Sequence, residues 1–263
     1  MSSTTTSAPI TSVGAAKIRT ITLDHPWRWL AAGWHDLRRA PTASLAFGSC
    51  FVVLSYLLTL GLVYGEMFYY IPPLAAGYLL VAPLLGIGLY DISRQLEQGS
   101  EVSLGRCCRA WRGNHVQIAA MGIILMMVML VWILIANLVF TVFFDKPIPN
   151  WENFIPVVFL SGKSPMFLLM GMLSGAAIAF FVFAISAISV PMLLDRPTDV
   201  MSAIITSIAA VRQNWRPMAL WAALIALLVG VGLITFYLAL AVTMPLVGHA
   251  TWHAYRDLVE PEV

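Results

Sequence analysis

Long apolar stretches without a charged side chain constrain this chain more than any other feature. Residues 42–64 and 116–143 contain no Asp, Glu, Lys or Arg. Each is long enough to cross a bilayer as an α-helix, which takes about 20 residues. Only 11% of all residues are charged, whereas a soluble domain has roughly 25%. So little charge does not cover a water-facing surface, and the sequence therefore predicts a protein whose main solvent is the bilayer.

A repeated segment indicates the internal organisation. VAPLLGIGLYDISRQLE (residues 81–97) is matched by TMPLVGHATWHAYRDLV (243–259), and SVPMLLDR (189–196) is a weaker third copy. Each copy begins in an apolar stretch, contains a proline and ends among charged residues. The first two copies pair Pro83 with Pro245, Gly86 with Gly248 and Arg94 with Arg256. This repeat predicts three related units.

Each unit is expected to hold a short amphipathic helix and then a hairpin of two spans. Asp24-His25-Pro26 and Arg196-Pro197-Thr198-Asp199 both have the capping side chain and early proline that begin a helix. Short helices with one aromatic and one basic face lie in the membrane interface. The expected fold class is therefore all-α: a polytopic membrane protein with six transmembrane helices as three hairpin repeats, each preceded by an amphipathic interfacial helix. The expected spans are 42–64, 74–91, 116–143, 165–193, 217–231 and 235–251.

A single six-helix transmembrane domain over residues 23–259 accommodates these units, whose boundaries are about 24–97, 100–194 and 197–259. Residues 1–22 are rich in Ser and Thr and are expected to form a disordered cytoplasmic tail. In the last unit, Gly230 and Gly232 offer a tight turn between two spans. The alternative is one long kinked helix over 217–258, which would leave the C-terminus on the other side.

The basic residues predict the orientation. With six spans, all of them except Lys146 and Lys163 share one side of the membrane. Cytoplasmic loops carry the excess of Lys and Arg, so both termini are expected in the cytoplasm. Six arginines of the interfacial helices are expected to attract anionic lipid headgroups by about 1 kcal/mol each. These lipid-interface residues are Arg38, Arg39, Arg106, Arg109, Arg212 and Arg216.

Four histidines are the only candidates for a cofactor site. His249 and His253 lie four residues apart and hence on one helical face, and His35 and His115 are expected at the same membrane depth. Imidazoles at one level can ligate haem iron or another metal. No cysteine or carboxylate pattern completes such a site, however, and ordinary interfacial histidines explain the pattern as well. The expectation is therefore a protein without a cofactor, a metal site or a catalytic residue. The alternative is that these histidines bind haem or a metal.

The spans also suggest what the chain binds. Gly171-x-x-x-Gly175 gives one span a small-residue face for close helix contact, either within the bundle or in a homo-oligomer. A net charge of +2 gives no reason to expect nucleic acid. The expected partners are membrane lipids, other membrane proteins or a second copy of the chain.

Three classes of function follow. The favoured class is a non-enzymatic accessory, assembly or scaffold protein that binds membrane partners or lipid. No charged residue lies well inside a span, and the sequence has no phosphate-binding glycine loop, nucleophile elbow or zinc-protease helix. The second class is a small-solute permease or channel, which predicts a water-accessible cavity near Pro83 and Pro245. The third is a haem- or metal-binding redox membrane protein.

Three strings carry a resemblance to a known family: HPWRWLAAGWHDLRRAP (25–41), APLLGIGLYDISRQLEQG (82–99) and PLVGHATWHAYRDLV (245–259). Residues 22–259 resemble bacterial integral membrane proteins grouped as domain of unknown function 2189. Members are sometimes labelled cytochrome c oxidase subunit I, but that subunit is about twice as long and has several buried histidine ligands, which this sequence lacks. The resemblance implies a six-helix protein of the bacterial inner membrane without an assigned activity.

Overall fold

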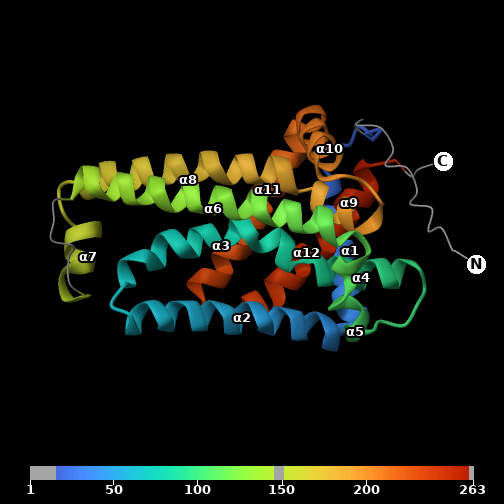
Figure 1. The fold of residues 1–263 in the computed structure, drawn as a ribbon, viewed down its shortest axis with the longest axis horizontal. Helices are drawn as coiled ribbons and strands as arrows, with labels where there is room; N and C mark the ends of the chain where they lie inside the picture. The colour runs from blue at the N-terminus through green and yellow to red at the C-terminus, as the bar shows by residue number, and fades with distance from the viewer. Residues whose placement is uncertain (1–15, 145–150, 261–263) are drawn as a thin grey trace, which may run out of the picture.

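The computed structural model describes residues 16–144 and 151–260. In this part of the chain the regular structure is helical, apart from one isolated antiparallel bridge between Ile18 and Val259. The long helices run side by side along the longest axis of the molecule, and several short helices gather at one end (Figure 1). The elements are α1 (His25–Arg39), α2 (Pro41–Tyr64), η1 (Phe68–Tyr70), α3 (Ile71–Leu85), α4 (Ile87–Glu97), α5 (Leu104–Cys107), η2 (Ala110–Asn114), α6 (His115–Phe143), α7 (Trp151–Phe159), α8 (Ser164–Ser186), α9 (Ser189–Asp195), α10 (Val200–Gln213), α11 (Trp215–Ile234) and α12 (Leu240–Leu258).

Four helical segments in the described residues are long and apolar enough to cross a membrane. They are Pro41–Tyr64, Leu104–Phe143, Ser164–Asp195 and Trp215–Ile234. The predicted all-helical class is thereby confirmed, and four of the six expected spans have a counterpart among these segments. The other two, 74–91 and 235–251, correspond to α3 with α4 and to α12, which are not among the four. α12 carries His249, His253 and Arg256, and ionisable side chains in membrane helices face the interior of the bundle.

The expected return of the first hairpin is broken into two helices. α3 ends at Leu85, two residues after Pro83, and α4 begins at Ile87. A proline withholds one backbone donor and crowds the preceding turn, but α3 runs through Pro83 and the break lies after it, at Gly86. α12 differs, because it runs through Pro245 without interruption. The equivalent prolines of the repeat therefore do not produce the same helix boundary.

The turn between α11 and α12 lies later than the sequence predicts. α11 continues through Gly230 and Gly232 to Ile234, and the chain reverses over Thr235–Ala239. Phe236 and Tyr237 adopt the left-handed region there, with φ of 51° and 71°. Gly232 instead lies against Leu240 at the start of α12, where an added Cβ would overlap the leucine side chain. The prediction of a glycine turn is therefore wrong, because Gly232 is used for close packing.

α1 begins at the predicted site, after Asp24 and with Pro26 in its first turn. Trp29, Gly33, Asp36 and Leu37 are buried against the rest of the protein. Trp34 is 44% exposed. An amphipathic interfacial helix offers its outer aromatic face to lipid, and this arrangement leaves that face available.

α10 has the capped start that the sequence predicts. The Asp199 carboxylate accepts hydrogen bonds from the backbone N–H groups of Met201 (3.0 Å) and Ser202 (2.9 Å). The side chain and backbone N–H of Ser202 hold the pKa of Asp199 below its usual value. An ionised carboxylate at a helix N-terminus satisfies otherwise unpaired donors. This cap fixes where the chain turns from α9 into α10.

α12 forms the centre of the packing. It contacts α1, α2, α4, α9 and α11, and its residues Trp252, Tyr255 and Leu258 are almost completely buried. Glycines on two of its neighbours allow the close approach. A Cβ at Gly33 of α1 would lie 2.7 Å from the backbone nitrogen of Ala250, and one at Gly48 of α2 would overlap the carbonyl oxygen of Ala241. Farther along the bundle, α3, α6 and α8 pack against one another.

The first described residues of the chain pack against the ends of α10 and α12. The Arg19 backbone N–H donates to the Leu258 carbonyl (2.9 Å), and the Asn214 side chain accepts from Ile21 (2.9 Å) and donates to the Arg19 carbonyl (3.0 Å). Residues 16–22, which the sequence assigns to the tail, are therefore packed between the end of α12 and the end of α10. The two ends of the described chain lie at the same end of the molecule (Figure 1).

Candidate functional site

The three copies of the repeated segment meet at the end of the bundle that holds the termini. The Arg94 side chain, at the end of α4, donates to the Leu194 carbonyl of α9 (2.9 Å). Arg256, near the end of α12, contacts Glu97 at 3.0 Å. Arg196, directly after α9, donates to the Tyr255 hydroxyl (2.8 Å). The repeated charged ends therefore bond to one another. We call this set of groups the terminal polar cluster.

A buried carboxylate lies in the terminal polar cluster. Asp91 is completely buried, and its oxygens accept from Arg94 Nη2 at 2.5 Å and from Gln95 Nε2 at 2.6 Å. The side-chain oxygen Oε1 of Gln95 accepts in turn from the Ser103 backbone N–H (3.0 Å). The expected span 74–91 ends at Asp91, where a carboxylate would meet water. The structure instead encloses Asp91 within the protein, because α4 packs against several other helices.

A second part of the terminal polar cluster joins α9 and α12. The Tyr255 hydroxyl donates to Asp195 Oδ2 at 2.7 Å, and Arg256 Nη1 lies 3.4 Å from the same oxygen. Each group is thus satisfied within the protein, as buried polar groups must be. Arg94 and Arg256 were counted in the sequence with the charges that orient the chain. The structure gives them a second role, because they also join the repeats.

His249 is the most enclosed of the four candidate histidines. Its Nε2 lies 2.9 Å from Ser44 Oγ on α2, and its Nδ1 lies 2.8 Å from Ser93 Oγ on α4. All three side chains are buried. Both ring nitrogens therefore have a protein partner, and the imidazole joins three helices.

His253, one turn later on α12, contacts α1 instead. Its Nε2 lies 2.8 Å from Asp36 Oδ2. Burial works to raise the pKa of Asp36, but the hydrogen bonds from His253 and Ser93 outweigh it and hold that pKa below its usual value. The Asp36 carboxylate therefore remains ionised at neutral pH, and the contact secures α1 to α12.

The structure does not bring the four histidines together. His35 and His115 are exposed, on α1 and at the start of α6, whereas His249 and His253 are directed to separate partners. Within residues 16–144 and 151–260, no group of three or more His, Cys, Asp or Glu side chains has a metal-binding arrangement. The residues present in this region do not fit a haem or metal centre built from these histidines.

All six predicted lipid-interface arginines are exposed. Two lie at the end of α1, one lies in α5 and one directly before η2, and the last two lie in α10 and at the start of α11. These elements lie at the end of the bundle that holds the termini (Figure 1). Among the described residues, none of the six forms an ion pair with a carboxylate. Arg94 and Arg256, by contrast, form ion pairs with Asp91 and Glu97.

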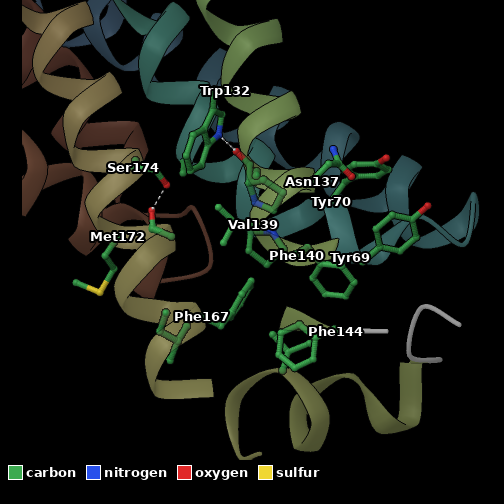
Figure 2. Close-up of a pocket in the computed structure, with 18 of the residues that line it drawn as sticks. Tyr69, Tyr70, Trp132, Asn137, Val139, Phe140, Phe144, Phe167, Met172 and Ser174 are labelled. Carbon is green, nitrogen blue, oxygen red and sulfur yellow. Dashed lines mark hydrogen bonds between the residues drawn. The ribbon is translucent and has the colours of Figure 1, made fainter. Parts of the chain in front are cut away.

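A pocket lies at the opposite end of the molecule. It has a volume of about 580 Å³ and is lined by residues of η1, α3, α6, α7 and α8. Figure 2 shows Phe140, Phe144 and Phe167 around it, with Trp132 deeper in the bundle. A smaller pocket of about 10 Å³ lies between α2, α3 and the turn after α11. Neither pocket is lined by Pro83 or Pro245, where the sequence placed the cavity of a permease.

Sequence reasoning missed both the terminal polar cluster and the pocket. The small-residue motif in α8 was the nearest signal, because Gly171 and Gly175 both line the pocket. A Cβ at Gly175 would meet Trp132 at 3.2 Å, whereas one at Gly171 would meet no atom within 4 Å. Gly175 thus serves packing inside the bundle, and Gly171 faces open space.

The fold and the apolar helices define an integral membrane protein. Residues 70–195 match the family described as "Predicted integral membrane protein (DUF2189)", which confirms the resemblance seen in the sequence. The matched part runs from the end of η1 through α9 and includes Asp91, Arg94 and most of the pocket. No curated protein and no solved structure matches the chain.

Proposed function

We propose that this chain is a non-enzymatic protein of the bacterial inner membrane, an accessory, assembly or scaffold protein that binds anionic lipid at its cytoplasmic surface. The observation that carries the proposal is the set of six exposed arginines on the short helices at one end of the bundle. We call this set the arginine rim: Arg38, Arg39, Arg106, Arg109, Arg212 and Arg216.

The arginine rim has free charge and aromatic neighbours. Its members are exposed and have no carboxylate partner among the described residues. Trp34, Trp111 and Trp215 lie beside them in the chain and are 44%, 47% and 62% exposed. Arg216 also lies over the Trp215 ring, 5.2 Å from its centroid. Indole rings favour the level of the headgroups, where the neighbouring guanidinium groups reach phosphate oxygens.

Replacing all six rim arginines by glutamine is expected to abolish the preference for anionic lipid. Each basic residue near an anionic surface contributes about 1 kcal/mol. The measurement is quenching of tryptophan fluorescence in bilayers by brominated phosphatidylglycerol, compared with brominated phosphatidylcholine. Wild-type protein should prefer the anionic lipid severalfold, and added salt should weaken that preference.

A variant with lysine at the same six positions is the matched control. It keeps the charge and should keep most of the preference. If the glutamine variant binds phosphatidylglycerol as well as the wild type does, the rim only orients the chain and the proposal fails.

The proposal includes six spans arranged as three hairpin repeats. Three observations support it. The order of a short helix, a long helix and a return segment recurs three times along the chain. The charged ends of the three return segments bond to one another. The two ends of the described chain also lie together (Figure 1). An even number of spans puts both ends on one side.

Reporter fusions are expected to give this topology. A reporter after Gly99 should be cytoplasmic, and one after Lys146, which lies outside the described residues, should be periplasmic. A reporter at Glu260 distinguishes six spans from five, because it should also be cytoplasmic. A periplasmic signal at Glu260 would remove the sixth span, and exchanged signals at the first two positions would reverse the orientation.

A further inference from the structure

The pocket at the end of the bundle away from the termini has walls that suit a hydrocarbon chain. Its volume of about 580 Å³ lies within the range of about 300–1,000 Å³ typical of ligand sites. Phe140, Phe144, Phe154 and Phe167 line it, and no charged side chain does. We propose that this pocket binds one acyl chain of a membrane phospholipid. The inference does not depend on the arginine rim.

The polar groups deep in the pocket are already satisfied by the protein. Trp132 Nε1 donates to the Pro73 carbonyl at 2.6 Å, and Asn137 Nδ2 donates to the Ile133 carbonyl at 2.8 Å. The hydroxyl groups of Thr141 and Ser174 donate to backbone carbonyls one turn earlier in their own helices, at 2.9 Å and 2.8 Å. A polar ligand would find few free donors there, whereas a hydrocarbon chain leaves these bonds intact.

The position of the pocket gives lipid direct access. Its walls include α6 and α8, which belong to two of the four candidate membrane spans. Met172, one of the lining residues, is 72% exposed on α8. Acyl chains of the bilayer therefore surround the outer surface of the helices that form the pocket. A lipid acyl chain that enters between these helices exchanges contacts with other lipids for contacts with aromatic rings of the protein.

The lining also distinguishes the two ends of the pocket. Tyr69 and Tyr70 come from η1, and Phe154 and Val158 come from α7, which lies at the end of the bundle (Figure 1). Figure 2 shows the two tyrosines on the side of the pocket away from α8. Tyrosine favours the level of the headgroups because one end of the side chain is polar. The bound chain therefore points inward from the membrane surface at which α7 and η1 lie.

Gly171 gives a variant that fills the pocket. An added Cβ there meets no atom within 4 Å, and Gly171 is part of the lining. Gly171→Phe should therefore occupy the pocket and still fold. Gly61→Phe is the matched control, because Gly61 lies in α2, another candidate span, and also has open space around an added Cβ, but it does not line the pocket.

The probe is phosphatidylcholine with a diazirine on its acyl chain, photolysed with the full-length protein in lipid nanodiscs. Adducts are mapped by mass spectrometry. Wild-type protein and Gly61→Phe should give adducts on the peptides that contain Asn137 and Ser174. In Gly171→Phe these adducts should fall by at least about tenfold, a loss of 1.4 kcal/mol in binding. Thermal unfolding should show that both variants fold.

A competition measurement on wild-type protein tests the same site without a mutation. Excess hexadecane should suppress the pocket adducts, whereas glycerophosphocholine, the headgroup without chains, should not. Equal labelling of Gly171→Phe and wild type would overturn the proposal, and so would suppression by glycerophosphocholine alone. If Gly171→Phe changes the oligomeric mass and leaves the adducts intact, the pocket is a contact with a second copy and the proposal is wrong.

Discussion

Replacement of Arg94 by leucine is expected to lower the free energy of unfolding by about 3–5 kcal/mol, the usual cost of removing one partner from a buried ion pair. Asp91 is completely buried, and Arg94 Nη2 lies 2.5 Å from its carboxylate. Without Arg94 the carboxylate keeps the hydrogen bond from Gln95 Nε2, and the Leu194 carbonyl loses the bond that joins α4 to α9. Unfolding in mixed detergent–SDS micelles measures the change.

Two further variants separate the buried charge from the loss of a side chain. Arg106→Leu removes an exposed arginine of the rim and should change stability by less than about 0.5 kcal/mol, as surface substitutions usually do. Asp91→Asn combined with Arg94→Leu removes the uncompensated charge and should recover part of the loss. If the double variant is less stable than Arg94→Leu alone, the ion pair is not the source of the effect.

The sequence predicted those features that a single continuous stretch of residues determines. Uncharged apolar stretches indicated α2 and α6, and Asp199 indicated the start of α10. These signals are local. A helix that crosses the bilayer needs apolar side chains along its own length, and a capping side chain bonds to the backbone N–H groups of the next few residues. The exposure of the rim arginines was predicted for the same reason.

The buried polar groups were harder to predict because their environment comes from other helices. Asp91 lies at the end of an apolar stretch, where a carboxylate is normally solvated. It is buried because α4 packs against several other helices, among them α9 and α12, which lie about 100 or more residues away in the chain. His249 is similar: Ser44 and Ser93, its two partners, are 205 and 156 residues away in the chain.

The repeat was the one signal in the sequence that reached across the chain. It placed Arg94 and Arg256 at equivalent positions, and both lie in the terminal polar cluster. It did not indicate that each arginine bonds to a neighbouring copy of the segment. Contacts between repeats are made by charged ends that the sequence alone assigns to the cytoplasmic surface.

The glycines that matter most for packing were also missed, because spacing alone does not identify a contact. Gly61-x-x-x-Gly65 of α2 has the same spacing as the motif in α8, yet an added Cβ at Gly61 meets nothing within 4 Å. The close contact of α2 with α12 occurs at Gly48, four residues after Ser44, a pair of small residues not singled out from the sequence. Buried helices approach one another wherever small residues face them.

Gly48→Ala is therefore expected to destabilise the protein by about 3 kcal/mol or more, at or above the upper end of ordinary overpacking. The new methyl group would overlap the backbone carbonyl of Ala241 and lie 2.9 Å from the Pro245 side chain. Neither group can rotate away, since one is helix backbone and the other is a proline ring. α2 must then move away from α12, against which it packs along much of its length and which carries the His249 contact with Ser44.

The same substitution at Gly61 is the control, because it lies on the same helix and makes no contact. Alanine is favoured over glycine inside a helix by about 1 kcal/mol, so Gly61→Ala should leave the protein as stable or slightly more stable. One added methyl group on α2 is thus expected to lower the free energy of unfolding at Gly48 and to leave it unchanged or raise it slightly at Gly61. Unfolding of both variants under the same conditions measures the difference. If Gly48→Ala were as stable as Gly61→Ala, α2 would not pack against α12 through Gly48, and the central place of α12 in the bundle would be wrong.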